Sequence, residues 1–153
     1  MRKCFKPYFG DFTCNHCGSY ISTDMALCGV NNRNHCPYCL HSKHVDLYQA
    51  GDRLSACKAP MEPVALALKK TNKKYGIKTQ GELMLIHCCK DCRKLSINRI
   101  AADDIAENIL EIFIRSHKLD YQVRAMLEQH GIQPLQPSDE EIVRARLFGF
   151  AYA

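Results

Sequence analysis

The chain has 153 residues, which is enough for one ordinary domain or for a small domain with an appendage, and which excludes a large multidomain enzyme. Apolar residues make up 46% of the chain and charged residues 24%, a composition typical of a folded globular protein. No apolar run approaches the roughly 20 residues that span a bilayer, so we expect no membrane association. The net charge of +5 permits an anionic partner such as nucleic acid.

The ten cysteines indicate metal binding. Residues 1–11 lack the apolar stretch of a secretory signal peptide, so the sequence predicts a cytoplasmic protein. Cysteines in that reducing compartment seldom form disulfides, which leaves metal ligation as the better explanation for them.

Cysteine content and charge divide the chain at the same place. Residues 1–99 hold every cysteine and carry 16 Lys or Arg against 7 Asp or Glu, whereas residues 100–153 carry 5 against 9. The first part stays basic after the negative charge of two thiolate-ligated zinc ions is allowed for. We therefore predict a zinc-ribbon domain over residues 1–99 and a helical C-terminal appendage over residues 100–153.

Three Cys-x-x-Cys pairs lie in the first part, and each suits a tight turn, or knuckle, that points two sulfurs at one zinc ion. The first two pairs are separated by 18 residues, a spacing typical of a four-cysteine zinc site. No βαβ pattern surrounds any pair, which disfavours a redox role of the thioredoxin type. The predicted ligands of the first site are Cys14, Cys17, Cys36 and Cys39.

The third pair, Cys89 and Cys92, needs two further ligands. Cys57 is the preferred third ligand, because it lies in a stretch bounded by Gly and Pro where a loop can present it. The fourth ligand stays open between two histidines. His44 lies at the start of a strand predicted over residues 45–48, whereas His87 shares a strand face with Cys89.

We favour His44 as the fourth ligand and keep His87 as the alternate. The remaining candidates for this position are His35, His41 and water. The choice matters, because a water ligand would make the zinc ion catalytic instead of structural.

The run Arg33-Asn34-His35-Cys36-Pro37 and the residues around it resemble the signature of the RNHCP family. An opening knuckle at residues 12–18, the segment 61–64 and the segment 98–104 follow in the family's order, so the resemblance covers roughly residues 9–105. It implies a small zinc-binding domain of a largely bacterial family, and it bears more on the fold than on the activity. One departure is Arg93, which stands where a Gly would commonly follow the third knuckle.

Alternating apolar residues predict two strands, over residues 64–68 and 83–87, that pair as a hairpin. The loop between them holds five lysines within ten residues and one tyrosine. Such a loop can follow a phosphate backbone and stack an unpaired base, although a loop that is merely solvated would have the same composition.

Arg33 and Arg53 are further candidates for phosphate binding, but they could equally pair with carboxylates such as Asp46 or Asp52. The predicted RNA-contacting residues are Arg33, Arg53, Lys69, Lys70, Lys73, Lys74, Tyr75 and Lys78.

Three helices are predicted after residue 100. Apolar spacing places the first over residues 102–116 and the second between residues 120 and 131. The third begins at Ser138, whose spacing to Glu141 matches a capping box. Short helices need packing partners, and the apolar end over residues 147–153 should either pack on the ribbon domain or contact a partner.

The sequence thus predicts a small α+β protein with a β-rich zinc-ribbon-like domain, two zinc ions and a helical C-terminal part. We expect a non-catalytic protein that binds RNA, with ribosomal or other structured RNA as its partner, an expectation that rests partly on fold-level analogy. One alternative is a zinc-dependent nucleic-acid hydrolase, which would need an open zinc position and nearby acids. Another is a protein-interaction adaptor that uses the helical tail.

The acids that a hydrolase would need for catalysis also have a structural explanation. Asp103 and Asp104 fall in the first turn of the helix predicted over residues 102–116, where carboxylates complement the helix dipole. The candidate acids are Asp46, Asp52, Asp103 and Asp104.

Overall fold

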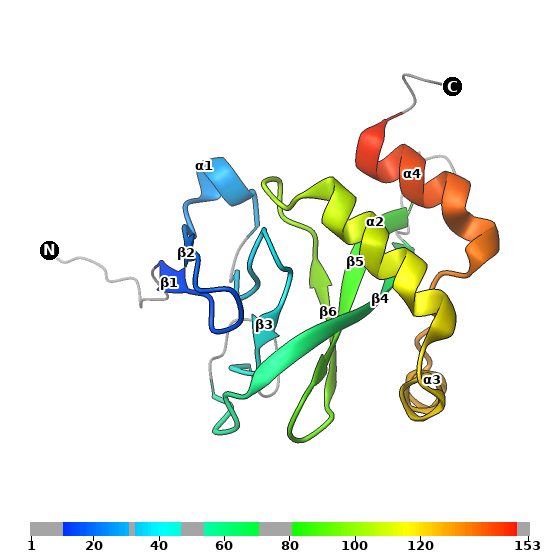
Figure 1. Cartoon of the computed structure of the whole chain (residues 1–153), viewed down its shortest axis with the longest axis horizontal. Helices are drawn as coiled ribbons and strands as arrows, with labels where there is room; N and C mark the ends of the chain where they lie inside the picture. The colour runs from blue at the N-terminus through cyan, green and yellow to red at the C-terminus, as the bar shows by residue number, and fades with distance from the viewer. Residues whose placement is uncertain (1–10, 31–32, 47–53, 71–80, 150–153) are drawn as a thin grey trace, which may run out of the picture.

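A four-stranded antiparallel sheet with helices on both faces forms the centre of the protein (Figure 1). The structure is a computed structural model that describes residues 11–30, 33–46, 54–70 and 81–149. The strand order is β3-β4-β5-β6, and the short strands β1 and β2 pair separately. The strands are β1 (Phe12–Thr13), β2 (Tyr20–Ile21), β3 (Ser42–Lys43), β4 (Pro60–Lys70), β5 (Gly81–Cys89) and β6 (Leu95–Arg99).

The helices lie in two parts of the chain. Helix α1 (Met25–Cys28) is a single turn beside the small ribbon, and the other helices follow β6. These are α2 (Ala106–Arg115), α3 (Tyr121–Gln129) and α4 (Glu140–Phe148), with short 3-10 turns at Ser116–Lys118 and Pro137–Asp139. None of the helices in the described ranges has the length and apolar character that crossing a bilayer requires.

The predicted hairpin is confirmed as β4 and β5, which pair from Met61 with Cys89 to Lys70 with Gly81. The register shifts by one residue between Pro63 and Ala65. A bulge suits this position, because a proline has no N–H to donate to the ladder.

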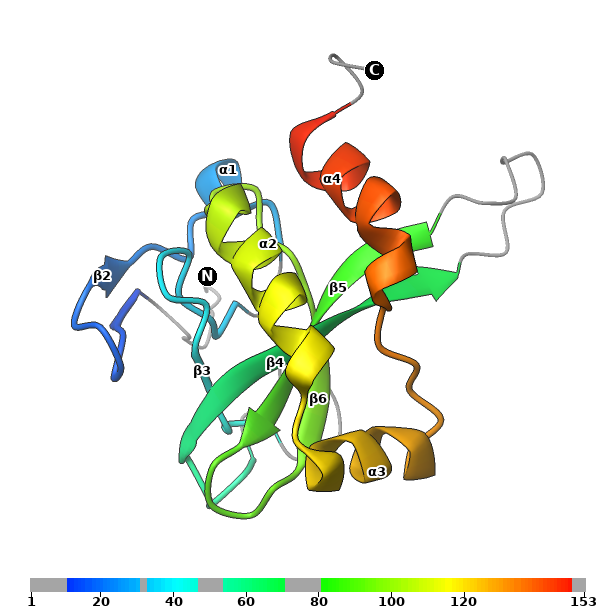
Figure 2. The same ribbon diagram turned by 45° about the vertical axis from the view of Figure 1, so that its right-hand side comes forward.

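Side chains of the hairpin alternate between two buried faces. On one face, Leu66 and Leu85 pack with Phe113 of α2 and Val143 of α4. On the other face, Ala65, Ala67 and Ile86 pack with Val123 and Leu127 of α3. Figure 2 shows α2 crossing the sheet while α3 lies near one end of it. The helices after residue 100 therefore pack against both faces of the sheet.

The helix boundaries differ from the predicted ones in two places. Helix α2 begins at Ala106, four residues later than predicted. The acids of the preceding turn bind residues elsewhere in the chain, as Asp104 does with Arg33, and do not start the helix. The predicted capping box of Ser138 and Glu141 is wrong, since the reciprocal hydrogen bonds join Gln136 and Asp139 instead. Residues 150–153 of the predicted apolar end lie outside the described residues.

The strand predicted over residues 45–48 is not found at its first two positions. The short strand lies earlier, at Ser42–Lys43, and the chain then turns, with the Val45 N–H donating to the Lys43 carbonyl at 2.9 Å. Residues 47 and 48 lie outside the described part of the chain.

Candidate metal centres

The three Cys-x-x-Cys pairs fold as three copies of one turn. In each copy the N–H of the first cysteine donates to the carbonyl five residues later, and its own carbonyl accepts from the N–H four residues later, at distances between 2.8 and 3.1 Å. The residue four positions after the first cysteine has a positive φ: 80° at Gly18, 65° at Leu40 and 67° at Arg93. The turn thus requires a left-handed backbone conformation at this position. That conformation costs residues other than glycine roughly 1–2 kcal/mol.

The second and third knuckles keep a side chain at this strained position. Leu40 is 1% exposed and packs in the core beneath α2, so its burial offsets the backbone cost. Arg93 is exposed, and its side chain gains no comparable burial. The departure from Gly noted at Arg93 therefore leaves the fold of this knuckle unchanged.

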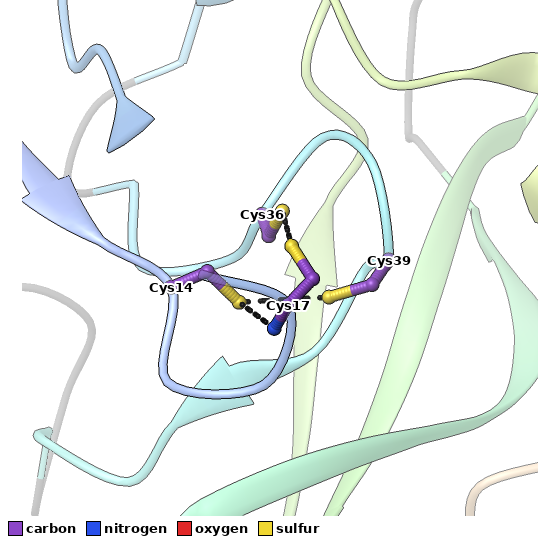
Figure 3. Close-up of side chains that lie close together, drawn as sticks. All are labelled: Cys14, Cys17, Cys36 and Cys39. Atoms are coloured by element: carbon purple, nitrogen blue, oxygen red, sulfur yellow. Dashed lines mark hydrogen bonds between the residues drawn. The ribbon is translucent and has the colours of Figure 1, made fainter. Parts of the chain in front are cut away.

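The first two knuckles face each other and bring four sulfurs together (Figure 3). The Sγ atoms of Cys14 and Cys39 are 3.5 Å apart, and those of Cys17 and Cys36 are 3.6 Å apart. A tetrahedral zinc with Zn–S bonds of about 2.3 Å requires S···S separations of about 3.8 Å. Disulfide sulfurs would be about 2.05 Å apart, so the spacing fits a zinc ion and excludes disulfides here.

Backbone amides support the thiolate form of the first site. The N–H groups of His16 and Tyr38 donate to the sulfurs of Cys14 and Cys36, each at 3.3 Å. The hydrogen bond with the Ser19 hydroxyl lowers the pKa of Cys17 to about 6. Hydrogen-bonded thiolates of this kind are the form that ligates zinc.

The second group consists of His44, Cys57, Cys89 and Cys92, whose ligand atoms all lie within 4.8 Å of one another. The sulfurs of Cys57 and Cys89 are 3.6 Å apart, and Nδ1 of His44 lies 3.4 Å from the sulfur of Cys92. With a Zn–N bond of about 2.0 Å and a Zn–S bond of about 2.3 Å, tetrahedral geometry requires an N···S distance of about 3.5 Å. The second group therefore also fits a zinc ion.

His87, the alternate fourth ligand, lies elsewhere. It is fully buried between the Leu40 carbonyl, 2.7 Å from Nε2, and the Asn98 carboxamide, 2.8 Å from Nδ1. Burial lowers the pKa of His87 to about 3, so the ring is neutral. His87 thus links β5 to the second knuckle through hydrogen bonds, and the second group draws its histidine from the end of β3.

Charge explains why the first group needs a cation. Burial raises the pKa of Cys36 and of Cys39, and it is the first cause in both cases. Four neighbouring sulfurs cannot all ionise without a compensating positive charge, which Zn²⁺ supplies. The protein thus has two zinc sites, each with four side-chain ligands, and all ligands of the first site precede all ligands of the second in the chain.

Arg33 and His35, which belong to the run that resembles the family signature, take part in a buried ion-pair network. The Arg33 guanidinium contacts Asp103 at 2.8 Å and Asp104 at 3.1 Å, and Nε2 of His35 lies 2.7 Å from Asp104. Asp104 also accepts the N–H of Ala101 at 2.8 Å. The side chains of Arg33 and Asp104 are both 0% exposed. Burial by itself would lower the pKa of Arg33, but the two carboxylates raise it above its ordinary value.

This network joins the second knuckle to the start of α2. The Ile105 N–H donates to the Pro37 carbonyl at 3.0 Å, and the Asn108 carboxamide donates to the Tyr38 carbonyl at 2.6 Å. The burial of Arg33 is at odds with its predicted role in binding RNA, because a phosphate cannot reach it. The prediction that arginine could instead pair with a carboxylate holds for Arg33, but its partners are Asp103 and Asp104 and not Asp46 or Asp52.

Sequence reasoning missed this role of Asp103 and Asp104. The only signal was that both acids stand inside a segment that resembles the family's pattern, as Arg33 and His35 do. Because they accept hydrogen bonds from the buried side chains of Arg33 and His35, they are unsuited to activate a water molecule.

The remaining predicted RNA contacts are only partly described. Lys69 is exposed on β4, and its cross-strand neighbour is Glu82. The side chain of Lys70 lies outside the described part of the structure. The same is true of Arg53, Lys73, Lys74, Tyr75 and Lys78, and of the candidate acid Asp52.

Comparisons with known proteins agree with the geometry. Neither the curated proteins nor the solved structures gave a match to this chain. The family model for the RNHCP domain matches residues 9–110, a range that passes the predicted boundary at residue 99 and ends within α2. Because the match covers about two thirds of the chain and includes both zinc sites, the protein belongs to the RNHCP family.

Proposed function

We propose that this protein is a zinc-stabilised RNA-binding protein whose main RNA contact is the lysine-rich connection between β4 and β5. The observation that carries the proposal is the register of the hairpin, in which Lys70 pairs with Gly81. The ten residues between these positions include Lys73, Lys74 and Lys78. They concentrate positive charge at one end of the longest hairpin in the described structure.

The zinc sites favour binding over hydrolysis. Each has four side-chain ligands, the arrangement of a structural zinc, whereas a catalytic zinc keeps one position for water. The candidate acids Asp103 and Asp104 bind Arg33 and His35. We therefore infer that the zinc ions stabilise the fold and that RNA binds at the protein surface.

The helices also favour RNA over a protein partner. Helices α2, α3 and α4 each bury an apolar face against the sheet, through Phe113, Val123 and Val143 respectively. The basic connection, in contrast, has the composition that phosphate binding uses. An adaptor role would have to rest on the residues that remain exposed on these helices.

The proposal is tested by measuring RNA affinity at several salt concentrations by fluorescence anisotropy. Changing Lys70, Lys73 and Lys74 to Glu should weaken binding at least tenfold and should flatten the dependence of log affinity on log salt by about 2, since each lost phosphate contact removes about 0.7–0.9.

The matched control carries the same charge change on the helices. Arg115, Lys118 and Arg124 are exposed, and their replacement by Glu should have a much smaller effect. If the two triple variants lost equal RNA affinity, the binding would be a non-specific effect of charge. A wild-type protein that binds neither single-stranded nor structured RNA would refute the proposal.

A further inference from the structure

A cavity of about 220 Å³ opens beside the first zinc site, between the first knuckle and β3. Its lining includes Phe12, Asn15, His16, Asn34, His41 and Lys43. An engineered cavity of about 150 Å³ holds benzene, so the space suffices for one planar heterocycle. It is smaller than the sites of drug-sized ligands, which begin at about 300 Å³.

Two imidazole rings form a stacked wall of this cavity. The centroids of His16 and His41 are 3.6 Å apart, and the ring planes differ by 3°. Both residues belong to knuckles: the His16 N–H donates to the sulfur of Cys14, and the His41 carbonyl accepts from the N–H of Cys36. Binding of zinc at the first site thus fixes the two rings. Because His16 is exposed, another flat ring can extend the stack.

The same two rings lie near Cys39, which raises the question of a third metal ion. The stack argues against it. A ring nitrogen binds a metal in the plane of its ring, and no ion can lie in the planes of two nearly parallel stacked rings whose centroids are 3.6 Å apart. An ion midway would stand up to about 1.8 Å out of each plane, although a Zn–N bond measures only about 2.0 Å. The geometry favours a stacking surface over a chelating pair.

The polar groups around the cavity suit the edge of a nucleobase. Asn34 is half-buried, and its side-chain amide makes no hydrogen bond to any described residue, while its backbone carbonyl accepts from Ser42. Asn15 is exposed on the knuckle, and Lys43 is exposed on β3. None of the described residues that line the cavity is acidic. A carboxamide can offer a donor and an acceptor to one base edge.

The geometry points to a binding site for one unpaired nucleobase, stacked on the His16–His41 pair, hydrogen-bonded by Asn34, with its phosphate near Lys43. This inference rests on the proposed function, since it names a second RNA contact. The two contacts lie far apart: β4 runs from Pro60, at the cavity, to Lys70, at the basic connection, about 33 Å away at the usual strand rise. They can therefore be tested separately.

The test compares single-stranded with fully duplex RNA by fluorescence anisotropy, using the zinc-loaded full chain. His16→Ala and Asn34→Ala should each weaken single-strand binding roughly tenfold, as expected for the loss of one stacked or recognised base, and should leave duplex binding unchanged. His130→Ala is the control, because His130 is an exposed histidine at the end of α3 that does not line the cavity. Each variant is first shown to hold two zinc ions.

Unchanged single-strand binding in both variants would overturn the inference, and it would leave the proposed function intact if the lysine variant still loses affinity. A third zinc ion in the wild type that disappears in His16→Ala would overturn it as well. If no RNA binds at all, titration with nucleoside 5′-monophosphates decides the point. Shifts of the Asn34 NMR signals in the wild type that are absent in His16→Ala identify a free nucleotide as the ligand, and the absence of shifts in the wild type refutes the site.

Discussion

The buried carboxylate of Asp104 should be highly sensitive to substitution. It accepts hydrogen bonds from Arg33, His35 and the N–H of Ala101, and it is fully buried. Replacing one partner of a buried ion pair usually costs 3–5 kcal/mol, because the other charge stays in the interior without compensation. Asp103 still contacts Arg33 at 2.8 Å, so we expect Asp104→Asn to lose about 3 kcal/mol, the lower end of that range.

Urea and thermal unfolding of the zinc-loaded protein, followed by circular dichroism, measure this loss. For a chain of this length, about 3 kcal/mol corresponds to a fall in Tm of about 6–12 °C. Asp103→Asn is the matched control, since the Asp103 side chain is 34% exposed and its pairing with Arg33 is partly screened by water. That control should lose about 1 kcal/mol or less.

The reasoning fails if the two variants lose equal stability, or if Asp104→Asn unfolds at the wild-type temperature. Zinc content has to be measured alongside. A variant that loses stability only because it has lost its zinc would place the effect at the metal site and not in the ion-pair network.

Three other predictions follow from the knuckles and the core. Elemental analysis should find two zinc ions per chain. A strong chelator should abolish the cooperative unfolding transition, because zinc binding and folding are coupled. A folded metal-free protein would contradict this. Arg93→Gly should gain about 0.5–1 kcal/mol in urea unfolding by relieving the left-handed backbone, whereas Leu40→Gly should lose stability because it empties a core position; a gain at both positions would show that Leu40 does not support the core. Phe113→Ala should lose about 3–5 kcal/mol and should unfold the sheet and helices together, whereas separate transitions would mean that the two parts fold independently.

Local patterns made much of this structure predictable. The spacing of the cysteine pairs identified the first zinc site, and the alternation around Leu66 and Leu85 identified the hairpin, because each Cys-x-x-Cys pair and each alternating run spans only a few residues. Cys57 was chosen for the second site because a loop could present it, and the structure brings it to Cys89.

Contacts between distant segments were harder to predict. His44 lies five residues after Cys39 and His87 two residues before Cys89, and only the fold places the first at the zinc ligands and the second at the Leu40 carbonyl. The partnership of Arg33 with Asp104 joins residues 71 positions apart, and no local pattern indicates it. The start of α2 was misplaced for the same reason, since its acids serve a partner far away in the chain.

The order of the ligands along the chain bears on how the metals are acquired during synthesis. Cys14 and Cys39 are 25 residues apart, whereas His44 and Cys92 are 48 residues apart, and the two loops follow one another without crossing. Closing the longer loop is less favourable by about 0.6 kcal/mol of chain entropy. The first ion can therefore be captured while the rest of the chain is still leaving the ribosome, and the second waits for the hairpin. A half-loaded intermediate with only its N-terminal ion is the expected species when zinc is scarce.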